Sequence, residues 1–387
     1  MTAVAQAQAT AERLAPTFAL RAAKHDLDGS FPAEDFDDLR TNGLLGLMVP
    51  DRLGGIGASF ADYAEIAMCL GAGSGSTALI FNMHASVTGA LALTDDDLAR
   101  ALGVPEPFFA ARDEVLRGAA AGRHYAVAMS ERGAGSRLSQ VTTTYEQVES
   151  GWRITGSKSF CSGAGHADAY VVAARRGEAI SQFLVPSGPG VTVVPTWDSL
   201  GMRATVSHDL DLDVVVPPDA LLGQVEGMAV LLAQVMPQWL VASYAAVYVG
   251  VAHAALTAAS EYVDERGLGR LPMVRSRLGR ADSAVAAARE VVRAMAKAVT
   301  TAPGEPATNR WVWRAKLIAG ETAMEVAASL LEACGAAATR RGSTLERIYR
   351  DARCGSLQPA TSDVCADWLG YAVLGRDPDA DAEVSRW

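Results

Sequence analysis

Cysteine is scarce in this chain, and the few cysteines present are widely spaced. Five occur among 387 residues, an odd number, and no two of them form a Cys-x-x-Cys pair. A disulfide framework uses even sets of cysteines and a zinc site uses closely spaced pairs, so neither organises this fold. The sequence therefore predicts reduced thiols in a cytoplasmic protein, with no metal site.

Positive charge is also in short supply. Lysine and arginine number 34 against 44 aspartates and glutamates, which gives a net charge of −10. A protein that binds a nucleic-acid phosphate backbone needs a surface rich in lysine and arginine, and no cluster of basic residues is evident in this sequence. We therefore expect no nucleic-acid partner.

Long apolar runs and a leader-like start are absent too. No stretch of about 18 or more uninterrupted apolar residues occurs, which argues against a membrane span. The first residues, MTAVAQAQ, contain neither a basic nor an apolar region. This start indicates no signal peptide, in keeping with a cytoplasmic location.

What remains is the composition of a globular enzyme. Half of the residues are hydrophobic and 20% are charged. At this length the chain can form two or three domains around an ample core.

The order of local patterns predicts an α+β fold. Apolar residues at helical spacing mark residues 36–42, 60–70, 77–93, 240–265, 281–299, 308–334 and 361–374. Short β-rich runs occupy residues 125–129, 142–148, 152–155, 170–174, 182–185, 191–194 and 210–216, with a hairpin turn at 149–151. We expect an N-terminal α-helical domain (residues 1–122), a middle β domain (123–217) and a C-terminal four-helix bundle (218–387).

A glycine-rich loop follows the first predicted strand. It runs from Ser130 to Ser136 as SERGAGS, and its small residues let the backbone approach a ligand closely. Taken alone, it is more typical of an ordinary turn at a strand end.

Several motifs in a fixed order give the loop a context. They are MSERGAGS (129–136), GSKSFCS (156–162), LGMR (200–203), YRDAR (349–353) and QPATSD (358–363), preceded by GLLGLMVP (43–50). Together they resemble the acyl-CoA dehydrogenase superfamily of flavoenzymes over nearly the whole chain. The resemblance implies a flavin cofactor, with FAD expected and FMN or a diffusible reduced flavin as alternatives.

The resemblance also implies where the flavin binds. The implied cofactor contacts are Met129, Ser130, Ser136, Phe160, Cys161, Ser162, Arg266, Gly335, Thr361 and Asp363. Phe160 and Ser162 stand where the family has tryptophan and threonine, which keeps an aromatic packing surface and a hydroxyl that faces the redox nitrogen. We expect Ser162 to take part in catalysis. Cys161 between them is either a reactive thiol or, more in keeping with its type, a small buried hydrophobe.

The proton-accepting glutamate of the dehydrogenases is missing. Aligned on the YRDAR motif, its position is Pro359, and proline cannot take a proton. Some family members carry the glutamate on another helix, where this chain has Leu240. Between residues 227 and 262 the only acid is Glu261, at the far end of that helix.

The expected binding site for the adenine end of the flavin departs from the family pattern as well. The family presents Gln-x-x-Gly-Gly-x-Gly to a neighbouring subunit's cofactor, whereas this chain has Glu332 and then Gly335 followed by three alanines. A carboxylate near a pyrophosphate is unfavourable unless it is paired. Arg266 remains as a phosphate contact, although one arginine at a helix end can equally be a surface charge.

Two more residues are candidates for catalysis. His84 lies on a predicted helix near where the family's substrate pocket opens, although a lone histidine on an apolar helix is more often a hydrogen-bonded core residue. Gln358 aligns with a histidine of the flavin monooxygenases of this fold. An amide orients a substrate but does not shuttle protons.

These observations favour a monooxygenase, or hydroxylase, that uses reduced flavin and dioxygen. The alternative is a dehydrogenase of acyl-CoA or acyl-carrier-protein thioesters with an unusual base, and a non-catalytic flavin-binding paralogue ranks third. The expected partners are a small-molecule or thioester substrate and a separate flavin reductase or electron-transfer flavoprotein. The Ala-rich apolar C-terminal helices predict a homotetramer or homodimer.

Overall fold

Six helices form the N-terminal part of the chain in the computed structural model, which describes residues 1–383 and 385–387. They are α1 (Ala3–Asp28), α2 (Ala33–Thr41), α3 (Phe60–Gly73), α4 (Gly75–Ala92), α5 (Asp96–Ala101) and α6 (Glu106–Ala120). Polar side chains cap the start of four of them: Thr2 at α1, Ser59 in a capping box with Asp62 at α3, Ser74 at α4 and Asp95 at α5. The predicted helices at 36–42, 60–70 and 77–93 correspond to α2, α3 and α4.

One mixed sheet follows. Its strands are β1 (Tyr125–Ala128), β2 (Thr144–Val148), β3 (Gly151–Cys161), β4 (Ala169–Arg176), β5 (Ala179–Pro186), β6 (Val191–Val194) and β7 (His208–Val216). The order is β1-β4-β2-β3-β7-β6, with β5 paired to β4. The β1–β4 pair is parallel, whereas β3 pairs antiparallel with both β2 and β7.

Strand β3 is longer than the sequence pattern predicted. The β2–β3 hairpin turns before Gly151, as expected, but β3 runs on past Thr155 to Cys161. Its extra residues pair with β7 up to Lys158, and the register then shifts before Cys161. Their polar side chains hid the strand from the hydrophobic pattern, because a bulged strand end need not alternate.

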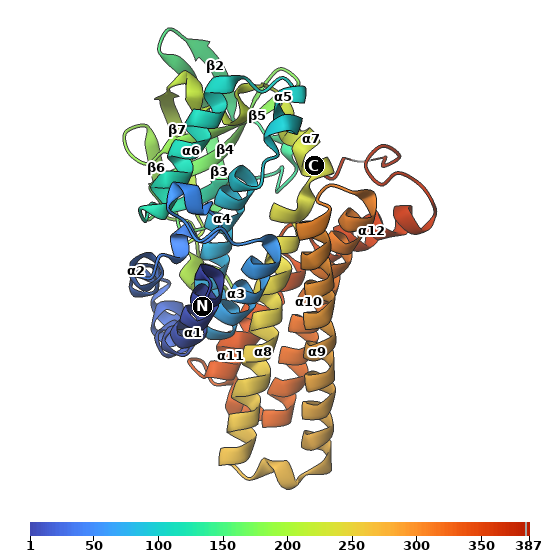
Figure 1. Ribbon diagram of the computed structural model, residues 1–387. Coiled ribbons are helices and arrows are strands. Elements are labelled where there is room, and N and C mark those ends of the chain that lie inside the picture. Colours follow the sequence, from blue (N-terminus) through green and yellow to red (C-terminus); the bar gives the residue numbers. More distant parts are fainter. Residues whose placement is uncertain (384) are drawn as a thin grey trace.

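The C-terminal half is helical. It contains α7 (Met228–Val235), α8 (Ala242–Glu265), α9 (Pro272–Thr301), α10 (Pro306–Cys334), α11 (Thr344–Arg353) and α12 (Ser362–Val373). Figure 1 shows α8, α9 and α10 extending as a bundle away from the sheet, while α12 projects sideways near it. Short 3₁₀ turns lie at η1 (Leu44–Gly46), η2 (Asp51–Leu53), η3 (Leu138–Gln140), η4 (Arg203–Thr205), η5 (Pro218–Ala220), η6 (Leu222–Gln224), η7 (Pro237–Trp239), η8 (Leu268–Arg270), η9 (Ala336–Thr339) and η10 (Cys354–Ser356).

The two helical regions share one hydrophobic core. Helix α3 crosses α8 at two glycines, Gly71 and Gly250. A Cβ on Gly250 would lie 2.3 Å from the Met68 carbonyl oxygen, so only glycine allows the two backbones to come this close. By length and composition the span Pro237–Glu265 is apolar enough to cross a membrane, but 67% of its apolar window is buried within the protein. Helix α8 is therefore a core helix of the bundle.

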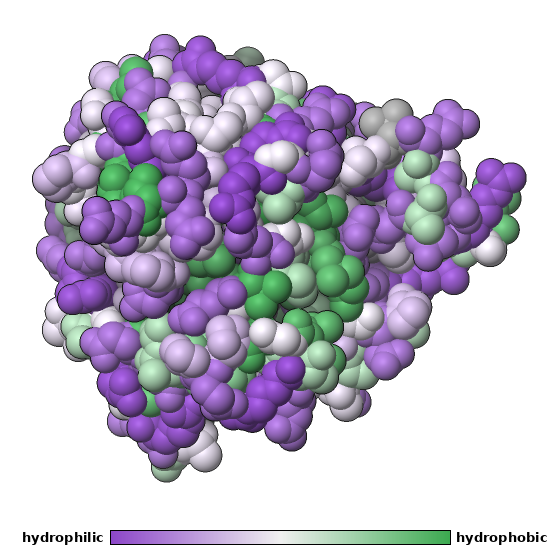
Figure 2. All heavy atoms as spheres, turned by 90° about the horizontal axis from the view of Figure 1, so that it is seen from above, coloured by the Kyte–Doolittle hydropathy of each residue, from purple (hydrophilic) through white to green (hydrophobic). Residues whose placement is uncertain are grey.

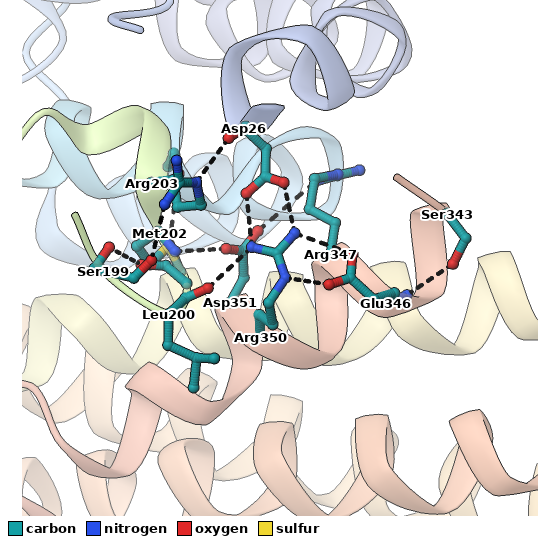
Figure 3. Close-up of polar contacts among 12 residues, drawn as sticks. Asp26, Ser199, Leu200, Met202, Arg203, Ser343, Glu346, Arg347, Arg350 and Asp351 are labelled. Atoms are coloured by element: carbon teal, nitrogen blue, oxygen red, sulfur yellow. Dashed lines mark hydrogen bonds and ion pairs between the residues drawn. The ribbon is translucent and has the colours of Figure 1, made fainter. Parts of the chain in front are cut away.

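A polar clasp joins the sheet to the bundle (Figure 3). Asp351 on α11 accepts the backbone N–H of Met202 at 2.6 Å, and the Arg350 guanidinium donates to the Leu200 carbonyl at 3.0 Å. The family motifs LGMR and YRDAR thus lie against each other. A Cβ on Gly201 would stand 2.1 Å from the Arg350 carbonyl oxygen, which requires a glycine at this contact.

The same clasp reaches the first helix. Arg350 forms a bidentate ion pair with Asp26 at the end of α1, at 2.9 and 2.5 Å. Arg203 donates to the Asp26 carbonyl oxygen at 2.9 Å. Figure 3 shows these side chains converging from α1, α11 and the start of η4, so three distant parts of the sequence are fixed to one another.

Candidate functional site

The glycine-rich loop is closed by its own backbone. Glu131 and Gly135 exchange two hydrogen bonds, at 3.0 and 2.8 Å. The Ser130 carbonyl accepts the Ser159 N–H at 2.9 Å, which ties this loop to the end of β3. The structure therefore brings Met129 and Ser130 beside the second predicted flavin segment, while Ser136 lies exposed on the outer part of the loop.

A buried ion pair supports both segments. Lys158 Nζ lies 2.6 Å from Glu131 Oε1, and the two side chains are only 0% and 3% exposed. Glu131 also accepts the N–H groups of Thr142 and Thr143, at 2.6 and 3.0 Å. Neither member of the pair was predicted, because nothing in the sequence pairs a lysine in a strand with an acid 27 residues earlier.

The pair stays charged despite its burial. Burial alone raises the pKa of Glu131, but hydrogen bonds from Lys158 and Thr142 outweigh it and bring that pKa down to about 2. Burial pulls the pKa of Lys158 downward, against the effect of its carboxylate partner. At 2.6 Å each group is the other's counterion, and the hydrogen bonds to Glu131 favour the ionised form of both.

Phe160 presents an aromatic face to solvent. It is 62% exposed, unusual for so large an apolar side chain, and its backbone adopts φ 57°, in the left-handed region that side chains rarely occupy. Trp197 packs edge-on against it, with ring centroids 6.0 Å apart. A strained, exposed aromatic residue is typical of a ligand-binding surface.

Ser162 begins a chain of hydroxyl groups. Its Oγ lies 2.9 Å from Ser207 Oγ, which lies 2.7 Å from Thr205 Oγ1, and Thr205 donates to the Met202 carbonyl at 2.8 Å. Cys161 is fully buried, and burial raises the pKa of its thiol well above the usual range. This burial favours the interpretation of Cys161 as a small hydrophobe.

His84 has no free ring nitrogen. Nε2 lies 2.6 Å from the Leu45 carbonyl and donates to it, while Nδ1 accepts the Tyr125 N–H at 3.0 Å. Burial lowers the pKa of His84 to about 4, so the ring is neutral at physiological pH. With both nitrogens bonded inside the core, this geometry favours the structural alternative over the predicted catalytic role.

Gln358 lies between two groups that the sequence analysis did not single out. Its Oε1 accepts from Tyr248 Oη at 2.7 Å, and its backbone carbonyl accepts from Lys316 Nζ at 3.2 Å. Pro359 follows it, half-buried, and Leu240 is half-buried just before α8. Each predicted base position thus carries a side chain that cannot bind a proton.

Thr361 and Asp363 lie at the start of α12. Thr361 is the N-cap and its Oγ1 accepts the Val364 N–H at 3.3 Å, whereas Asp363 is exposed in the first turn. A helix N-terminus with a hydroxyl and a carboxylate is a local stabilising pattern. Either residue can contact a ligand only with the outward-facing part of its side chain.

The structure does not bring Arg266 and Gly335 to the other candidates within one chain. Arg266 is exposed after α8 and lies over the Tyr262 ring, and Gly335 is exposed after α10. Figure 1 shows these helix ends at the tip of the bundle opposite the sheet. Nearby, Glu332 pairs with Arg277 at 2.6 Å, so the unexpected carboxylate has a counterion.

The residues beside the sheet fit an aromatic, hydrogen-bonding cofactor. Phe160 offers a ring face, Ser162 offers a hydroxyl, and the Ser159 Oγ is buried without a hydrogen-bond partner among the described residues. Among all the residues that the structure describes, no group of three or more histidine, cysteine or acidic residues is placed to hold a metal ion.

Three family profiles match the chain in the order of its three parts. The acyl-CoA dehydrogenase N-terminal domain matches residues 4–95, the middle domain matches 126–215, and the C-terminal domain matches 242–361. The chain belongs to the acyl-CoA dehydrogenase family, which confirms the predicted family and fold class.

Similar proteins include both dehydrogenases and monooxygenases of this family. Putative acyl-CoA dehydrogenase YdbM of Bacillus subtilis is 29% identical, over 91% of this chain and 92% of that protein. L-Evernosamine nitrososynthase of Micromonospora sp. is 31% identical, over 95% of this chain and 89% of that protein. Dibenzothiophene monooxygenase of Rhodococcus qingshengii is 27% identical, over 96% and 94% respectively. The crystal structure of FMN-bound TdsC from Paenibacillus sp. A11-2 superimposes with a TM-score of 0.82 at 26% identity, over 95% and 97% of the two chains.

Proposed function

We propose that this protein is a flavin-dependent monooxygenase that uses reduced flavin and dioxygen to oxidise a small molecule. The observation that carries the proposal is the pair Pro359 and Leu240 at the two positions where the family places its base. Dehydrogenation of a thioester requires removal of an α-proton, and a positioned base contributes about 10²–10⁴ in rate. A monooxygenase needs no carboxylate there.

The relatives that are not dehydrogenases support the same chemistry. They include a nitrososynthase and a dibenzothiophene monooxygenase, and TdsC has been crystallised with FMN and with indole. A flavin is therefore the cofactor we assign to this chain, and FMN or exchangeable reduced flavin suits it better than the FAD first expected. Ala336 and Ala338 stand where the family's adenine-binding pattern has glycines, and their Cβ atoms hold the backbone away from a pyrophosphate.

The roles of the residues follow from their positions. Bound reduced flavin supplies the electrons that activate dioxygen. Phe160 would pack against the flavin ring, Ser130 and Ser162 would donate hydrogen bonds to it, and Lys158 with Glu131 keeps both segments in place. Gln358 orients the substrate as a hydrogen-bonding amide. Pro359, the next residue, supplies apolar surface that excludes water from the reaction space.

A second copy of the chain completes the site in this proposal. Arg266 and Gly335 reach a flavin only from another subunit, because they lie at the far tip of the bundle. Figure 2 shows hydrophobic atoms gathered across the face seen from above, next to the projecting segment. Exposed apolar side chains on α7 and at the end of α12 are Leu231, Leu232, Val235, Val373 and Leu374. Such a surface favours a homodimer or homotetramer.

Two reactions test the function. The flavin-loaded protein is mixed anaerobically with straight-chain acyl-CoA thioesters, and we expect no bleaching of the flavin absorbance. Reduced FMN from a separate flavin reductase is then supplied with isotope-labelled dioxygen and indole as the probe, and we expect labelled oxygen in the product by mass spectrometry. Rapid anaerobic bleaching by an acyl-CoA would instead establish the dehydrogenase.

A further inference from the structure

Lys316 is a buried cation without an acid. Its side chain is completely inaccessible to solvent on α10, and among the described residues no carboxylate lies within ion-pair distance of its Nζ. Burial lowers the pKa of Lys316 to about 8. Burying an ammonium group without a counterion costs free energy, so the hydrogen bonds of Lys316 are needed to offset that cost.

Both hydrogen bonds of Lys316 go to one loop. Nζ donates to the Gly355 carbonyl at 2.9 Å and to the Gln358 carbonyl at 3.2 Å. These carbonyls flank the turn that leads from α11 into α12, the segment where the family's base would stand. The Lys316 ammonium thus fixes the backbone of this turn directly.

The turn is also held by close packing. A Cβ on Gly320 of α10 would lie 2.6 Å from the Gly355 carbonyl oxygen, and a Cβ on Gly355 would lie 2.8 Å from the Tyr248 ring. The loop is therefore clamped between α8 and α10, and Gly355 leaves no room for a side chain.

Tyr248 sets the direction of the Gln358 side chain. The phenol is fully buried, burial raises its pKa far above the usual value, and Gln358 Oε1 is the only acceptor of its hydrogen among the described residues. Leaving that hydrogen unbonded would carry a desolvation penalty, so Oε1 faces Tyr248. The Gln358 amide N–H₂ group then points the other way, and no described residue accepts from it.

We propose that Lys316 is a positioning residue that fixes the turn before α12, so that Gln358 presents a hydrogen-bond donor next to Pro359, the position where the dehydrogenases of this family place their proton acceptor. The proposal, which rests on the monooxygenase function, names the chemical class of group that Gln358 contacts. That group is a hydrogen-bond acceptor such as a carbonyl, hydroxyl or negatively charged oxygen. A donor here stabilises negative charge on oxygen instead of removing a proton from carbon.

Hydrogen–deuterium exchange tests the positioning without any flavin. The amides of Leu357 and Gln358 bond to the Cys354 carbonyl at 3.0 and 2.9 Å. In Lys316→Met we expect these amides to exchange about 10- to 100-fold faster, the range for losing hydrogen bonds to a charged group. The matched control is Lys297→Met, which removes an exposed lysine of α9. Unchanged exchange in the loop of Lys316→Met would overturn the proposal.

Flavin reactivity tests the consequence for Gln358. We expect Lys316→Met and Tyr248→Phe to bind FMN within about threefold of wild type, because the loops beside the sheet are untouched. Their reduced, FMN-loaded forms should differ from wild type in the rate of reaction with dioxygen by about tenfold or more, as should Gln358→Leu. The double variant Lys316→Met/Gln358→Leu should match Gln358→Leu alone, since both changes remove the same donor.

The outcomes separate the two proposals. The rate of reaction with dioxygen could instead change in the double variant by the product of the two single-variant changes. That result would mean that Lys316 acts independently of Gln358, through stability alone, and would overturn the positioning role. Tyr248→Phe removes only the hydroxyl that donates to Gln358. This variant therefore still tests the orientation of Gln358 if Lys316→Met does not fold. If the wild-type protein binds no FMN, the proposed function fails, and the exchange measurement alone then decides the role of Lys316.

Discussion

Replacing Lys158 with methionine should destabilise the protein strongly. The variant keeps most of the side-chain volume but leaves Glu131 as a buried carboxylate without a counterion. Both side chains are almost completely inaccessible, so solvent screening cannot soften the loss. Breaking a buried pair by removing one partner costs about 3–5 kcal/mol. The N–H groups of Thr142 and Thr143 still bond to Glu131, which places the expected loss near the lower end.

Denaturant unfolding at neutral pH measures this loss, followed by intrinsic tryptophan fluorescence. The control is Glu131→Gln/Lys158→Met, which removes both charges and should recover at least half of the lost stability. The deficit of Lys158→Met should shrink in mild acid, because a desolvated Glu131 without its lysine takes up a proton more readily. A loss below about 1 kcal/mol, or a double variant no better than the single one, would refute the inferred role of the pair.

Four further predictions concern the site and the clasp. Burial raises the pKa of Asp351 to about 6, above its unfolded value of about 3.9, so its contribution to stability is present below pH ~4 and lost as pH rises through ~6. Asp351→Asn should remove this pH dependence, worth up to about 3 kcal/mol, in unfolding curves recorded from pH ~4 to ~7. Phe160→Ala should weaken FMN binding by about 10-fold or more in fluorescence titrations, through lost aromatic contact, with little change in melting temperature. Ser162→Leu should abolish turnover or weaken flavin binding, and unchanged values of both would contradict the assigned position. Light scattering at micromolar concentration should show a dimer or tetramer, and a monomer would contradict the shared site.

Sequence patterns and family motifs were sufficient for the fold class, but the predicted helices did not include α1, α5, α6, α7 or α11. Capped helices and short strands can be recognised from a few neighbouring residues. The motifs at residues 129–136 and 156–162 indicated the two segments predicted to bind the flavin. The prediction for β3 stopped too early because Gly156 and the polar residues after it resemble a loop, although they pair with β7.

The supporting residues of the site were beyond such reasoning. Tyr248 and Gln358 are 110 residues apart, and Lys316 contacts Gln358 across 42 residues. From the sequence alone a lysine is expected at the surface. Only the fold shows that Lys316 is buried and which carbonyl groups accept its hydrogen bonds. His84 illustrates the converse, because only the structure shows that both of its nitrogens are bonded.

Met202 gives the site a property that no single side chain explains. Its carbonyl accepts the last hydrogen bond of the hydroxyl chain that starts at Ser162, and its N–H donates to Asp351. Asp351 lies on α11, which is followed by the turn that carries Gln358. The Ser162 segment of the sheet and the Gln358 turn of the bundle are thus linked through one residue. In the proposed site a ligand meets two surfaces whose relative position is set by this link, so little binding energy is spent on bringing them together. Selectivity in the proposed site then depends on the side chains that contact the ligand, and substrate preference can change by substitution there while the link stays the same.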